Sequence, residues 1–545
     1  MLPMIPTDYS DSRPSPAVGI RPSHRGLAVA GGLVAILGFA LLNLAYLSVS
    51  PLDLAPDEAH YWDWSRRLDW SYYSKGPMVA WLIRASCSLL GDTAFAVRVP
   101  AVLCNALMLV AVFLLARRTL DSDRLALAAL GLGMVLPPLS AGAVLTTIDA
   151  PFLCCWSWAL LGVHRAVFDN DRRVWIAAGV AVALGTLTKY TMLAFPALAA
   201  VWLVASRFEP RHLRDVARMA AIGSLGLVPI LIWNWHQDWI GVRHLFGQAG
   251  LATGPKIGFK PLGPLDYLAG QFAFLGGYWF CAFALAAWTF RPSRDRQLTF
   301  LWWYSVPLVL IFVPFSLRVK IQPNWPAAAY LAGFLLAFAW LRRDWFSEPS
   351  RYRSLVRALF AIGVGASVAL SIAARFPQLM LPVFASIVPE PTGDRLAPVR
   401  NLDPTARLRG WRHLAAEVDV LRDRIAREDG QTAELATMTW TVPGELAFYC
   451  RGNPTVYSFG TALNDRYSQY DLWRPNPIAD AQAFAGRTFV YVGEKLPEGI
   501  DAFDSLAGPF RVEYRENGVV VGGWKLWVAR GYRGFPDPQP KRPQY

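Results

Sequence analysis

Long apolar runs, separated by short polar stretches, occupy the first two thirds of the chain. Each run is close to the ~20 residues that an α-helix needs to cross the ~30 Å hydrocarbon layer of a bilayer. We therefore predict an α-helical polytopic membrane protein with about eleven spans, at residues 26–49, 95–116, 122–139, 150–168, 174–188, 190–206, 216–235, 265–289, 298–317, 324–341 and 355–373.

The pattern changes after residue 375. The stretch "TARLRGWRHLAAEVDVLRDRIAREDG" has apolar residues at helical spacing from Leu408 to Ile425, and Gly430 is a stop signal. Strands are predicted in "AELATMTW", "PTVYSFG" and "RTFVYVGE", and a hairpin is predicted about Asn517 and Gly518. We predict a soluble α/β domain over 390–545, a transmembrane domain over 26–375 and a disordered tail over 1–25.

Two connectors between the predicted spans, 50–94 and 236–263, are long enough to carry a function. In the first, "PMVAWLIRASCSLLG" predicts an amphipathic helix on the membrane surface. We expect its apolar face to hold Val79, Leu82, Ile83, Ser86, Leu89 and Leu90.

Composition agrees with a membrane protein, because 54% of the 545 residues are hydrophobic and only 17% are charged. The net charge of +13 is mainly a topology signal. With the N-terminus cytoplasmic, the cytoplasmic connectors hold 21 Lys and Arg residues and the opposite side holds 11. This bias predicts a multi-pass protein of the cell inner membrane with a periplasmic C-terminal domain. No nucleic-acid partner is expected, since the arginines are scattered over several connectors.

Charged residues in the first connector are candidates for chemistry. Asp57 and Glu58 follow the first predicted span, where an unpaired carboxylate next to lipid is costly to desolvate. Lys75 comes eighteen residues after Asp57, close enough to share a pocket with it. The alternative is an interfacial loop with snorkelling charges and an aromatic belt.

Further polar residues lie at the ends of later spans and in the second connector. Each of these residues, taken singly, is compatible with a polar group at the membrane interface whose hydrogen bonds are satisfied. For the aspartate in "LTTIDAPF", the alternative is a helix N-cap. Together they suit an anionic, lipid-borne substrate, because cations neutralise a phosphate while a carboxylate accepts a proton. Aromatic rings of the first connector, such as Tyr61, can flank a sugar. These polar candidates are Asp149, Lys189, Arg243, His244, Lys320 and Asn324.

The segment "PDEAHYWDWSRRLDWSYYSKGPMVAWLI", followed by "GDTAFAVRVPAV", resembles the first outer loop of the GT-C-fold glycosyltransferases that use lipid-linked sugars. "TTIDAPF", "LTKYT" and "KIQPNWPAAAY" resemble later markers of the same group. The branch is that of the lipid A aminoarabinose transferases and the bacterial relatives of protein O-mannosyltransferases, of the glycosyltransferase family 39/83 type. The resemblance covers roughly residues 26–375.

The resemblance implies roles for individual residues. Asp57 is implied to be the catalytic carboxylate, with Glu58 beside it in the acceptor site, and Lys75 is implied to bind the carrier phosphate. Asp149 is implied to be a second acidic site residue, and Lys189 and Lys320 to be phosphate or sugar contacts. No cofactor is predicted. Aminoarabinose transferases have a metal-binding glutamate before the matching lysine, and here that position is Ser74, which disfavours a divalent metal.

The function expected from these residues and from the resemblance is transfer of a sugar, with inversion, from a polyprenyl-phosphate donor to a cell-envelope acceptor at the periplasmic face. Lipid A, other lipopolysaccharide or another glycolipid is the favoured acceptor, and protein is less favoured. The partners are therefore the donor, the glycolipid acceptor and membrane lipids. A transporter or flippase of polyprenyl-linked sugars is the main alternative, although its charges are expected near the bilayer midplane. A non-catalytic assembly subunit would leave the acidic residues unexplained.

Overall fold

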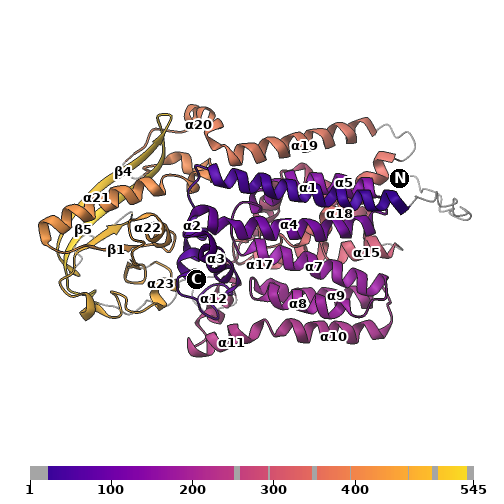
Figure 1. Cartoon of the computed structure of the whole chain (residues 1–545), viewed down its shortest axis with the longest axis horizontal. Helices are drawn as coiled ribbons and strands as arrows, with labels where there is room; N and C mark the ends of the chain where they lie inside the picture. The colour runs from indigo at the N-terminus through magenta and orange to yellow at the C-terminus, as the bar shows by residue number, and fades with distance from the viewer. Residues whose placement is uncertain are drawn as a thin grey trace, which may run out of the picture.

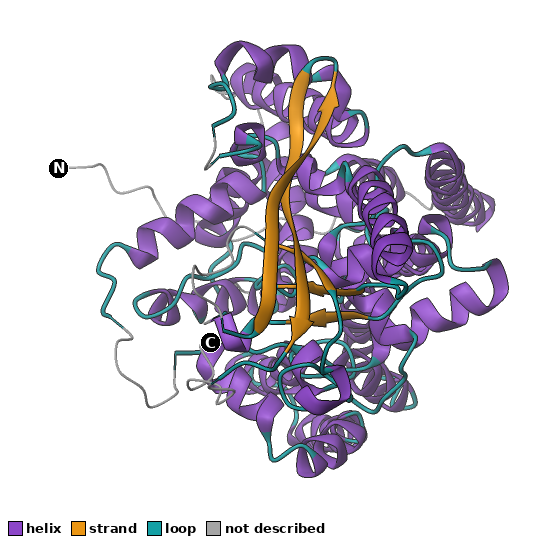
Figure 2. Ribbon diagram, turned by 90° about the vertical axis from the view of Figure 1, so that its left-hand side faces the viewer, coloured by secondary structure: helices purple, strands orange, loops and turns teal. Residues whose placement is uncertain are grey.

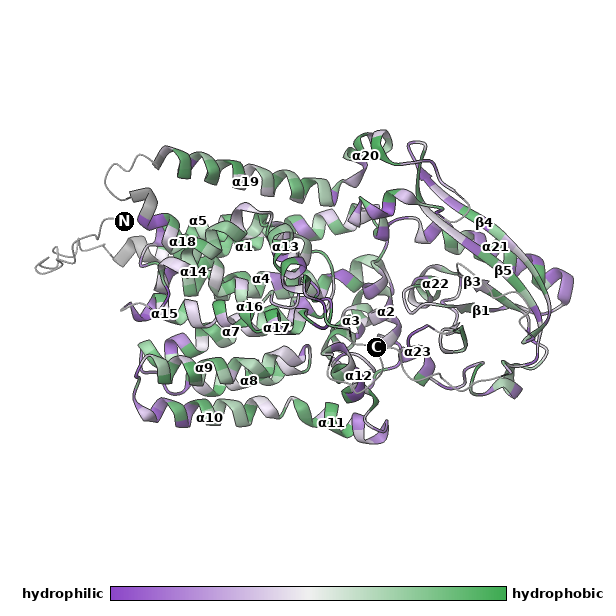
Figure 3. Cartoon of the chain, turned by 180° about the vertical axis from the view of Figure 1, so that it is seen from behind, coloured by the Kyte–Doolittle hydropathy of each residue, from purple (hydrophilic) through white to green (hydrophobic). Residues whose placement is uncertain are grey.

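A computed structural model describes residues 22–250, 258–292, 295–346, 353–392, 395–463, 465–493 and 501–536. Long helices lie side by side in a bundle, and a sheet domain caps one end of it (Figure 1). The bundle helices are largely hydrophobic along their length, whereas hydrophilic and hydrophobic residues are interspersed in the sheet domain (Figure 3). The predicted class, a polytopic helical protein with a C-terminal α/β domain, is confirmed.

Each predicted span overlaps one or more helices in the structure. Among the described residues, five helices are long and apolar enough to cross a membrane, and two bent helix pairs raise the number to seven. The count of eleven therefore stays a prediction. The bundle consists of α1 (Pro22–Val49), α4 (Ala94–Thr119), α5 (Asp123–Val135), α6 (Pro137–Gly142), α7 (Asp149–Phe168), α8 (Val174–Thr186), η1 (Tyr190–Leu193), α9 (Ala194–Ala205), α10 (Pro210–Ser224), α11 (Leu227–His236), α13 (Gly263–Phe274), α14 (Tyr278–Thr289), α15 (Arg296–Trp303), α16 (Val306–Leu310), α17 (Phe312–Ser316), α18 (Ala329–Phe346) and α19 (Arg353–Arg375).

The predicted span 265–289 is not one straight helix. It consists of α13 and α14, which meet at an angle of 113°. Gly276 and Gly277, between them, both have φ of +70°, a left-handed conformation that glycine adopts without steric cost. The bend places Phe274 and Leu275 on the wall of an internal cavity.

The first long connector folds into α2 (Pro56–Ser65) and α3 (Met78–Leu90). The helix predicted in its second half is present, and its place on the membrane surface stays a prediction. Val79 and Ile83 are fully buried, because the first turns of α3 pack against α2 and α4. Leu89 is 85% exposed, and Leu90 is exposed as well, since the last turn projects from this contact.

The C-terminal domain contains a five-stranded sheet of order β2-β1-β3-β5-β4. The predicted hairpin is confirmed: Asn517 and Gly518, with φ of 48° and 83°, turn between its two long strands (Figure 2). The helix predicted from Leu408 begins only at Trp411. Gly410, with φ of +88°, is not in a helical conformation and precedes its first residue. The elements are α20 (Leu381–Ile387), α21 (Trp411–Asp429), β1 (Glu434–Thr437), α22 (Pro443–Tyr449), β2 (Val456–Ser458), α23 (Gln469–Leu472), β3 (Phe489–Val492), β4 (Phe503–Glu516) and β5 (Val519–Tyr532).

The sheet domain shares a hydrophobic core with the first connector. Trp62 and Ile83 of the connector belong to the same buried cluster as Leu446 of α22. The backbones also touch, because a Cβ on Gly444 would lie 2.6 Å from the carbonyl carbon of Ala59. The first connector and the tail therefore pack as one unit, although the predicted boundary at residue 390 stays a prediction.

Candidate active site

A polar cavity lies where the first connector, the second connector and the sheet domain meet. It has an empty volume of about 570 Å³ and is continuous with solvent. Three segments that are far apart in sequence supply its walls: α2 with the following loop, α12 (Ile240–Gln248), and part of the sheet domain. Its lining residues are Asp57, His60, Tyr61, Tyr73, Ser74, Lys75, His244, Gln248, Trp440, Arg466, Tyr467, Ser468 and Gln469.

Asp57 lies in the first turn of α2, directly after Pro56 at the start of the helix. Its carboxylate is half-buried and makes no hydrogen bond or ion pair with any residue that the structure describes. Burial raises the pKa of Asp57, and the positive charges of Arg407 and Lys75 partly oppose that rise. A free carboxylate with a raised pKa is suited to accepting a proton.

Lys75 faces the same cavity from the loop between α2 and α3. Within the described part of the chain, its ammonium has no hydrogen-bond or ion-pair partner. Burial, followed by the positive charge of Lys189, lowers the pKa of Lys75 to about 8. A cation without a partner at this position is available to an anionic ligand.

Gly76 brings the Lys75 loop onto the bundle. A Cβ at residue 76 would lie 2.1 Å from the carbonyl oxygen of Leu187, so only glycine fits this contact. The same oxygen accepts a hydrogen bond from the backbone N–H of Met78 (3.2 Å). Because Leu187 is two residues before Lys189, this contact sets the two lysines close together.

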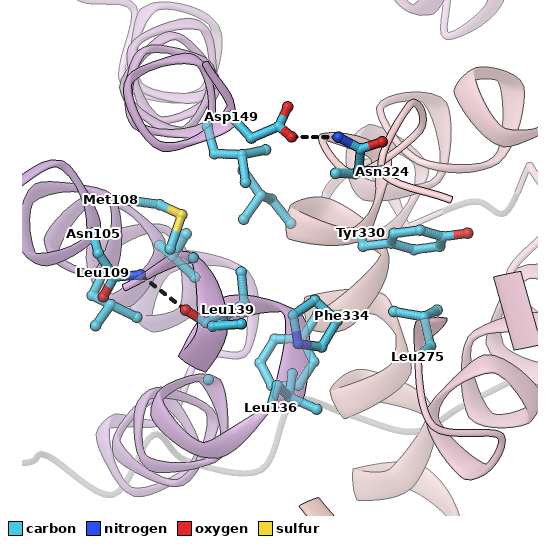
Figure 4. A pocket seen from close by; sticks show the side chains of 18 of the residues that line it. Asn105, Met108, Leu109, Leu136, Leu139, Asp149, Leu275, Asn324, Tyr330 and Phe334 are labelled. Carbon is cyan, nitrogen blue, oxygen red and sulfur yellow. Dashed lines mark hydrogen bonds between the residues drawn. The ribbon is translucent and has the colours of Figure 1, made fainter. Parts of the chain in front are cut away.

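Asp149, in contrast, is fully paired. Its carboxylate accepts hydrogen bonds from Lys189 Nζ (2.8 Å) and from Asn324 Nδ2 (2.6 Å), the second of which is drawn in Figure 4. Lys189 also donates to the carbonyl oxygen of Asn324 (3.3 Å). Asp149 is the first residue of α7 and its side chain does not cap the helix, because Ile148 occupies the N-cap position. The three predicted residues thus form one polar cluster, the Asp149 cluster.

A large apolar cavity opens beneath the Asp149 cluster, inside the helical bundle (Figure 4). It has an empty volume of about 1450 Å³. Its walls come from α4, α5, α6 and α7 on one side and from α13, α14 and α18 on the other. Asp149 lines this cavity and pairs with Lys189, and Leu187, two residues before Lys189, accepts a hydrogen bond from Met78 beside the Lys75 loop, so the polar and apolar cavities are neighbours. This arrangement can hold a long apolar chain whose charged end reaches the lysines.

Glu58 does not line the polar cavity. It is fully buried and forms an ion pair with Arg98 (2.8 Å between Oε2 and Nη2). Its carboxylate also accepts hydrogen bonds from the backbone N–H of Ala55 and of Thr146, each at 2.9 Å. Glu58 therefore ties the start of α2, which carries Asp57, to α4 and to the segment before α7.

The structure separates the other predicted site residues into two groups. Tyr61 and His244 line the polar cavity and are buried. The pKa of His244 is lowered to about 3 by burial and by the charges of Lys75 and Arg466, so its imidazole is neutral at pH 7. Arg243 is exposed and donates to the carbonyl oxygen of Asp238, and Lys320 is also exposed. Neither of these two cations lines the polar or the apolar cavity.

Sequence reasoning missed the residues that the sheet domain supplies. The Arg466 guanidinium lies 4.7 Å from the ring centre of Trp440, and both residues line the polar cavity with Gln469. Arg407, in the segment before α21, exerts the strongest attraction on the Asp57 carboxylate. No local motif marks these residues, because Arg466, Trp440 and Gln469 reach the cavity only when the sheet domain docks onto α2.

The donor set around Ser74 does not form a preassembled zinc or calcium site. Such sites need several carboxylate, imidazole, thiolate or carbonyl ligands around one point. The described residues hold no group of three or more such side chains with that arrangement. The side chains that share the cavity with Ser74 include the cations Lys75 and Arg466, which oppose a further positive charge.

Comparisons with known proteins agree with this geometry. Residues 74–235 match the family model described as dolichyl-phosphate-mannose-protein mannosyltransferase. The chain is 30% identical over 354 residues to the lipid A galacturonosyltransferase RgtD of Rhizobium johnstonii, covering 64% of this chain and 72% of that protein. It is 26% identical to the undecaprenyl phosphate-alpha-4-amino-4-deoxy-L-arabinose arabinosyl transferase of Pseudomonas aeruginosa, over 51% of this chain and about half (47%) of that relative.

Among solved structures, ArnT from Cupriavidus metallidurans bound to undecaprenyl phosphate has the same fold. The TM-score is 0.56 at 18% identity, over 92% of this chain and 98% of that chain. The relatives make the chain a membrane glycosyltransferase, the solved structure shows the same fold, and the predicted resemblance is confirmed. The chain belongs to the family of the lipid A galacturonosyltransferase RgtD. The alternative of a transporter or flippase finds no support in these comparisons.

Proposed function

We propose that this glycosyltransferase moves a sugar from a polyprenyl-phosphate carrier to a glycolipid of the cell envelope, with lipid A or another part of lipopolysaccharide as the favoured acceptor. The observation that carries the proposal is the unpaired Asp57 and Lys75 in a cavity beside the paired Asp149 cluster and its apolar cavity. The prenyl chain would lie in the apolar cavity, and the phosphate would lie near Lys75. The names of the relatives, which denote transfer of galacturonic acid or of 4-amino-4-deoxyarabinose, leave the sugar open.

The chemistry follows from the charges. The bond between sugar C1 and the phosphate oxygen breaks, and its electron pair leaves with the polyprenyl phosphate. Lys75, aided by Lys189, would stabilise the leaving group through charge-assisted hydrogen bonds. The acceptor oxygen attacks C1 from the opposite face, which inverts the anomeric centre. A hydroxyl acceptor would give its proton to Asp57, whereas a phosphate acceptor would need no base.

The location of the site is also part of the proposal. The excess of Lys and Arg in the connectors at the other end of the bundle supports a cytoplasmic N-terminus and a periplasmic sheet domain in the inner membrane. We retain the predicted division into a tail over 1–25, a transmembrane domain over 26–375 and a sheet domain over 390–545. Protease added to right-side-out vesicles tests this orientation. A sheet domain that faces the cytoplasm would stay uncut, whereas a periplasmic one would be cut.

The direct test is transfer by the purified protein in lipid nanodiscs. Polyprenyl-phosphate sugars are supplied as donors and lipid A as acceptor, and mass spectrometry detects the added sugar. We expect a mass increase of one sugar residue together with release of polyprenyl phosphate. Lipopolysaccharide of unchanged mass in a deletion strain, together with no transfer in vitro, would contradict the proposal.

A further inference from the structure

His60 lies in the wall of the polar cavity, and the proposed transfer does not use it. It is on α2, three residues after Asp57, so the two side chains lie one turn apart on the same face of the helix. The imidazole is buried, and the rings of Trp64 and Trp440 contact it edge-on, at 4.7 and 5.3 Å between ring centres. These contacts restrict the orientation of the imidazole.

One nitrogen of this imidazole is already in use. His60 Nδ1 lies 3.2 Å from the hydroxyl of Tyr470, which is on α23 of the sheet domain. The same hydroxyl is hydrogen-bonded to the carboxylate of Asp63, one turn further along α2. Asp63 is buried and pairs with Arg66 (3.2 Å), and a carboxylate in an ion pair can only accept hydrogen bonds. The Tyr470 hydroxyl therefore donates to Asp63.

This chain of hydrogen bonds sets the tautomer of His60. The Tyr470 hydroxyl has one hydrogen, which it gives to Asp63, so its oxygen accepts a hydrogen bond from His60 Nδ1. Burial and the positive charge of Arg466 lower the pKa of His60 to about 3, so the imidazole is neutral at pH 7 and carries one hydrogen. That hydrogen is on Nδ1. Nε2 keeps a lone pair and has no hydrogen-bond partner among the described residues.

A neutral acceptor in the cavity wall restricts which ligand group can bind beside it. Nε2 accepts a hydrogen bond from a hydroxyl, whereas an ionised phosphate has no hydrogen to donate. Because the pKa of His60 lies far below 7, Nε2 does not take a proton from the substrate. Its role therefore differs from that of Asp57, whose pKa is raised. Sugar hydroxyls are the groups of the proposed substrates that match Nε2.

We propose that His60 Nε2 accepts a hydrogen bond from a sugar hydroxyl of the substrate, and that Tyr470 and Asp63 hold His60 in the tautomer that permits it. His60 is then a substrate-binding residue one turn from Asp57, and Tyr470 and Asp63 are positioning residues. The hydroxyl belongs either to the donor sugar or to the glycolipid acceptor. The inference rests on the proposed transfer and deepens it, because it assigns the sheet domain a part in binding the sugar.

His60→Asn tests the contact directly. The amide N–H of asparagine takes the place of Nδ1–H beside Tyr470, but asparagine has no atom at the position of Nε2. We expect kcat/KM for transfer to fall about 2- to 13-fold, the range of one neutral hydrogen bond. His236→Asn is the matched control and should keep wild-type kinetics, because His236 is exposed at the end of α11 and lines neither cavity.

Donor analogues that each lack one sugar hydroxyl distinguish the two sources. If His60 binds the donor, wild type and His60→Asn should use one of these analogues equally well, because the partner of Nε2 is then absent in both. If His60 binds the acceptor, the difference should persist with every analogue, and the KM for lipid A should rise in the variant. A loss that is the same with every analogue and leaves the KM for lipid A unchanged would overturn the inference.

Nitrogen NMR measures the tautomer without relying on transfer. The chain has seven histidines, so labelled histidine gives few signals, and the signal that is missing in His60→Asn belongs to His60. We expect the hydrogen on Nδ1 in the wild type and a mixture of tautomers in Tyr470→Phe. Tyr470→Phe should also lower kcat/KM, and combining it with His60→Asn should cause no further loss, since both changes remove one contact. A hydrogen on Nε2 in the wild type would overturn the inference.

Binding to the wild-type protein separates this inference from the proposed function. If no sugar is transferred, the Nε2 signal is followed during titration with bare polyprenyl phosphate, polyprenyl-phosphate glucose and lipid A. A change toward a hydrogen-bonded nitrogen with either sugar-bearing lipid, and none with the bare phosphate, would uphold the role of His60 although the proposed function had failed. The same change with bare polyprenyl phosphate, or no change with any of the three, would refute it.

Discussion

The Asp149 cluster and the two charged residues of the polar cavity, Asp57 and Lys75, differ in whether their charges have partners. In the Asp149 cluster, the carboxylate has two partners within 2.8 Å, and the Lys189 side chain is 11% exposed. In the polar cavity, Asp57 and Lys75 have no partner among the described residues, although burial shifts the pKa of both. Unpaired charges that are partly buried are costly and occur mainly where a ligand completes them. We therefore expect Asp57 and Lys75 to act on a substrate, and the Asp149 cluster to hold the site together.

The largest effect is expected for Asp57→Asn, which keeps the size of the side chain and removes its charge. Transfer to a hydroxyl acceptor should fall by about 10² to 10⁴, the usual contribution of a positioned general base. Folding should be preserved, because the carboxylate has no structural partner. The measurement is the single-turnover rate with saturating donor.

Asp266→Asn is a suitable control, since Asp266 is exposed at the start of α13. Asp63, although in the same connector as Asp57, is not suitable, because it is buried and paired with Arg66. Full activity of a folded Asp57→Asn protein would return Asp57 to the role of an interfacial charge.

A smaller effect is expected for Lys75→Ala. Loss of a charge-assisted hydrogen bond costs about 1.5–3 kcal/mol, so donor affinity should fall by about 10- to 150-fold. The KM for the acceptor should change little, and Lys75→Arg should rescue poorly, because a planar fork replaces a compact ammonium. Donor titrations of wild type, both variants and the exposed control Lys260→Ala test this prediction, and wild-type donor affinity in Lys75→Ala would refute it.

The pH dependence of donor use should follow the same lysine. The pKa of Lys75 is lowered to about 8 from its ordinary 10.5, so the ammonium loses its proton as the pH rises above about 8. The value of kcat/KM for the donor should then fall about tenfold between pH 8 and pH 9.5, whereas Lys75→Arg should show no such fall. A profile of the wild type that stays flat up to pH 10 would mean that the charge of Lys75 is not needed.

The smallest effect concerns the stability of the paired cluster. Asp149→Asn and Lys189→Met should each lower the melting temperature, and the double variant should recover part of the loss, because neither ion then remains uncompensated. Asp57→Asn and Lys75→Met, in contrast, should combine additively. Thermal unfolding in detergent measures both double-mutant cycles. A recovery in the Asp57 and Lys75 cycle would show that these two residues are paired after all.

Site residues that lie at span ends could be predicted from the sequence, whereas residues that only packing brings to the site could not. Asp57 follows the first predicted span and Asp149 comes just before the fourth, so polarity at a span end was enough to find them, and Lys75 was found because it lies only eighteen residues after Asp57. The Asp149 contact with Lys189 and Asn324 was also within reach, since all three lie at span ends on the same predicted face. Their roles remain predictions.

The remaining features depend on packing that no local pattern encodes. Glu58 has the same sequence context as Asp57, yet the helical turn directs it to Arg98 instead of the cavity. Arg466 and Trp440 look like ordinary surface residues of the tail until the sheet domain docks onto α2. The bend between α13 and α14 was missed because hydropathy does not report the left-handed conformations of Gly276 and Gly277.

The core shared by the first connector and the sheet domain has a consequence for synthesis of the protein. The hydrogen bond from Leu54 N–H to the Tyr449 hydroxyl joins residues 395 positions apart. At about 5–20 residues per second, the ribosome needs on the order of 20–80 s to supply the second half of this contact after the first. Until then, Trp62 of α2 lacks its edge-on contact with Phe448 of α22. We therefore expect one face of α2 to stay uncovered during synthesis, and a chain truncated within the tail would lack the wall that the sheet domain gives the polar cavity.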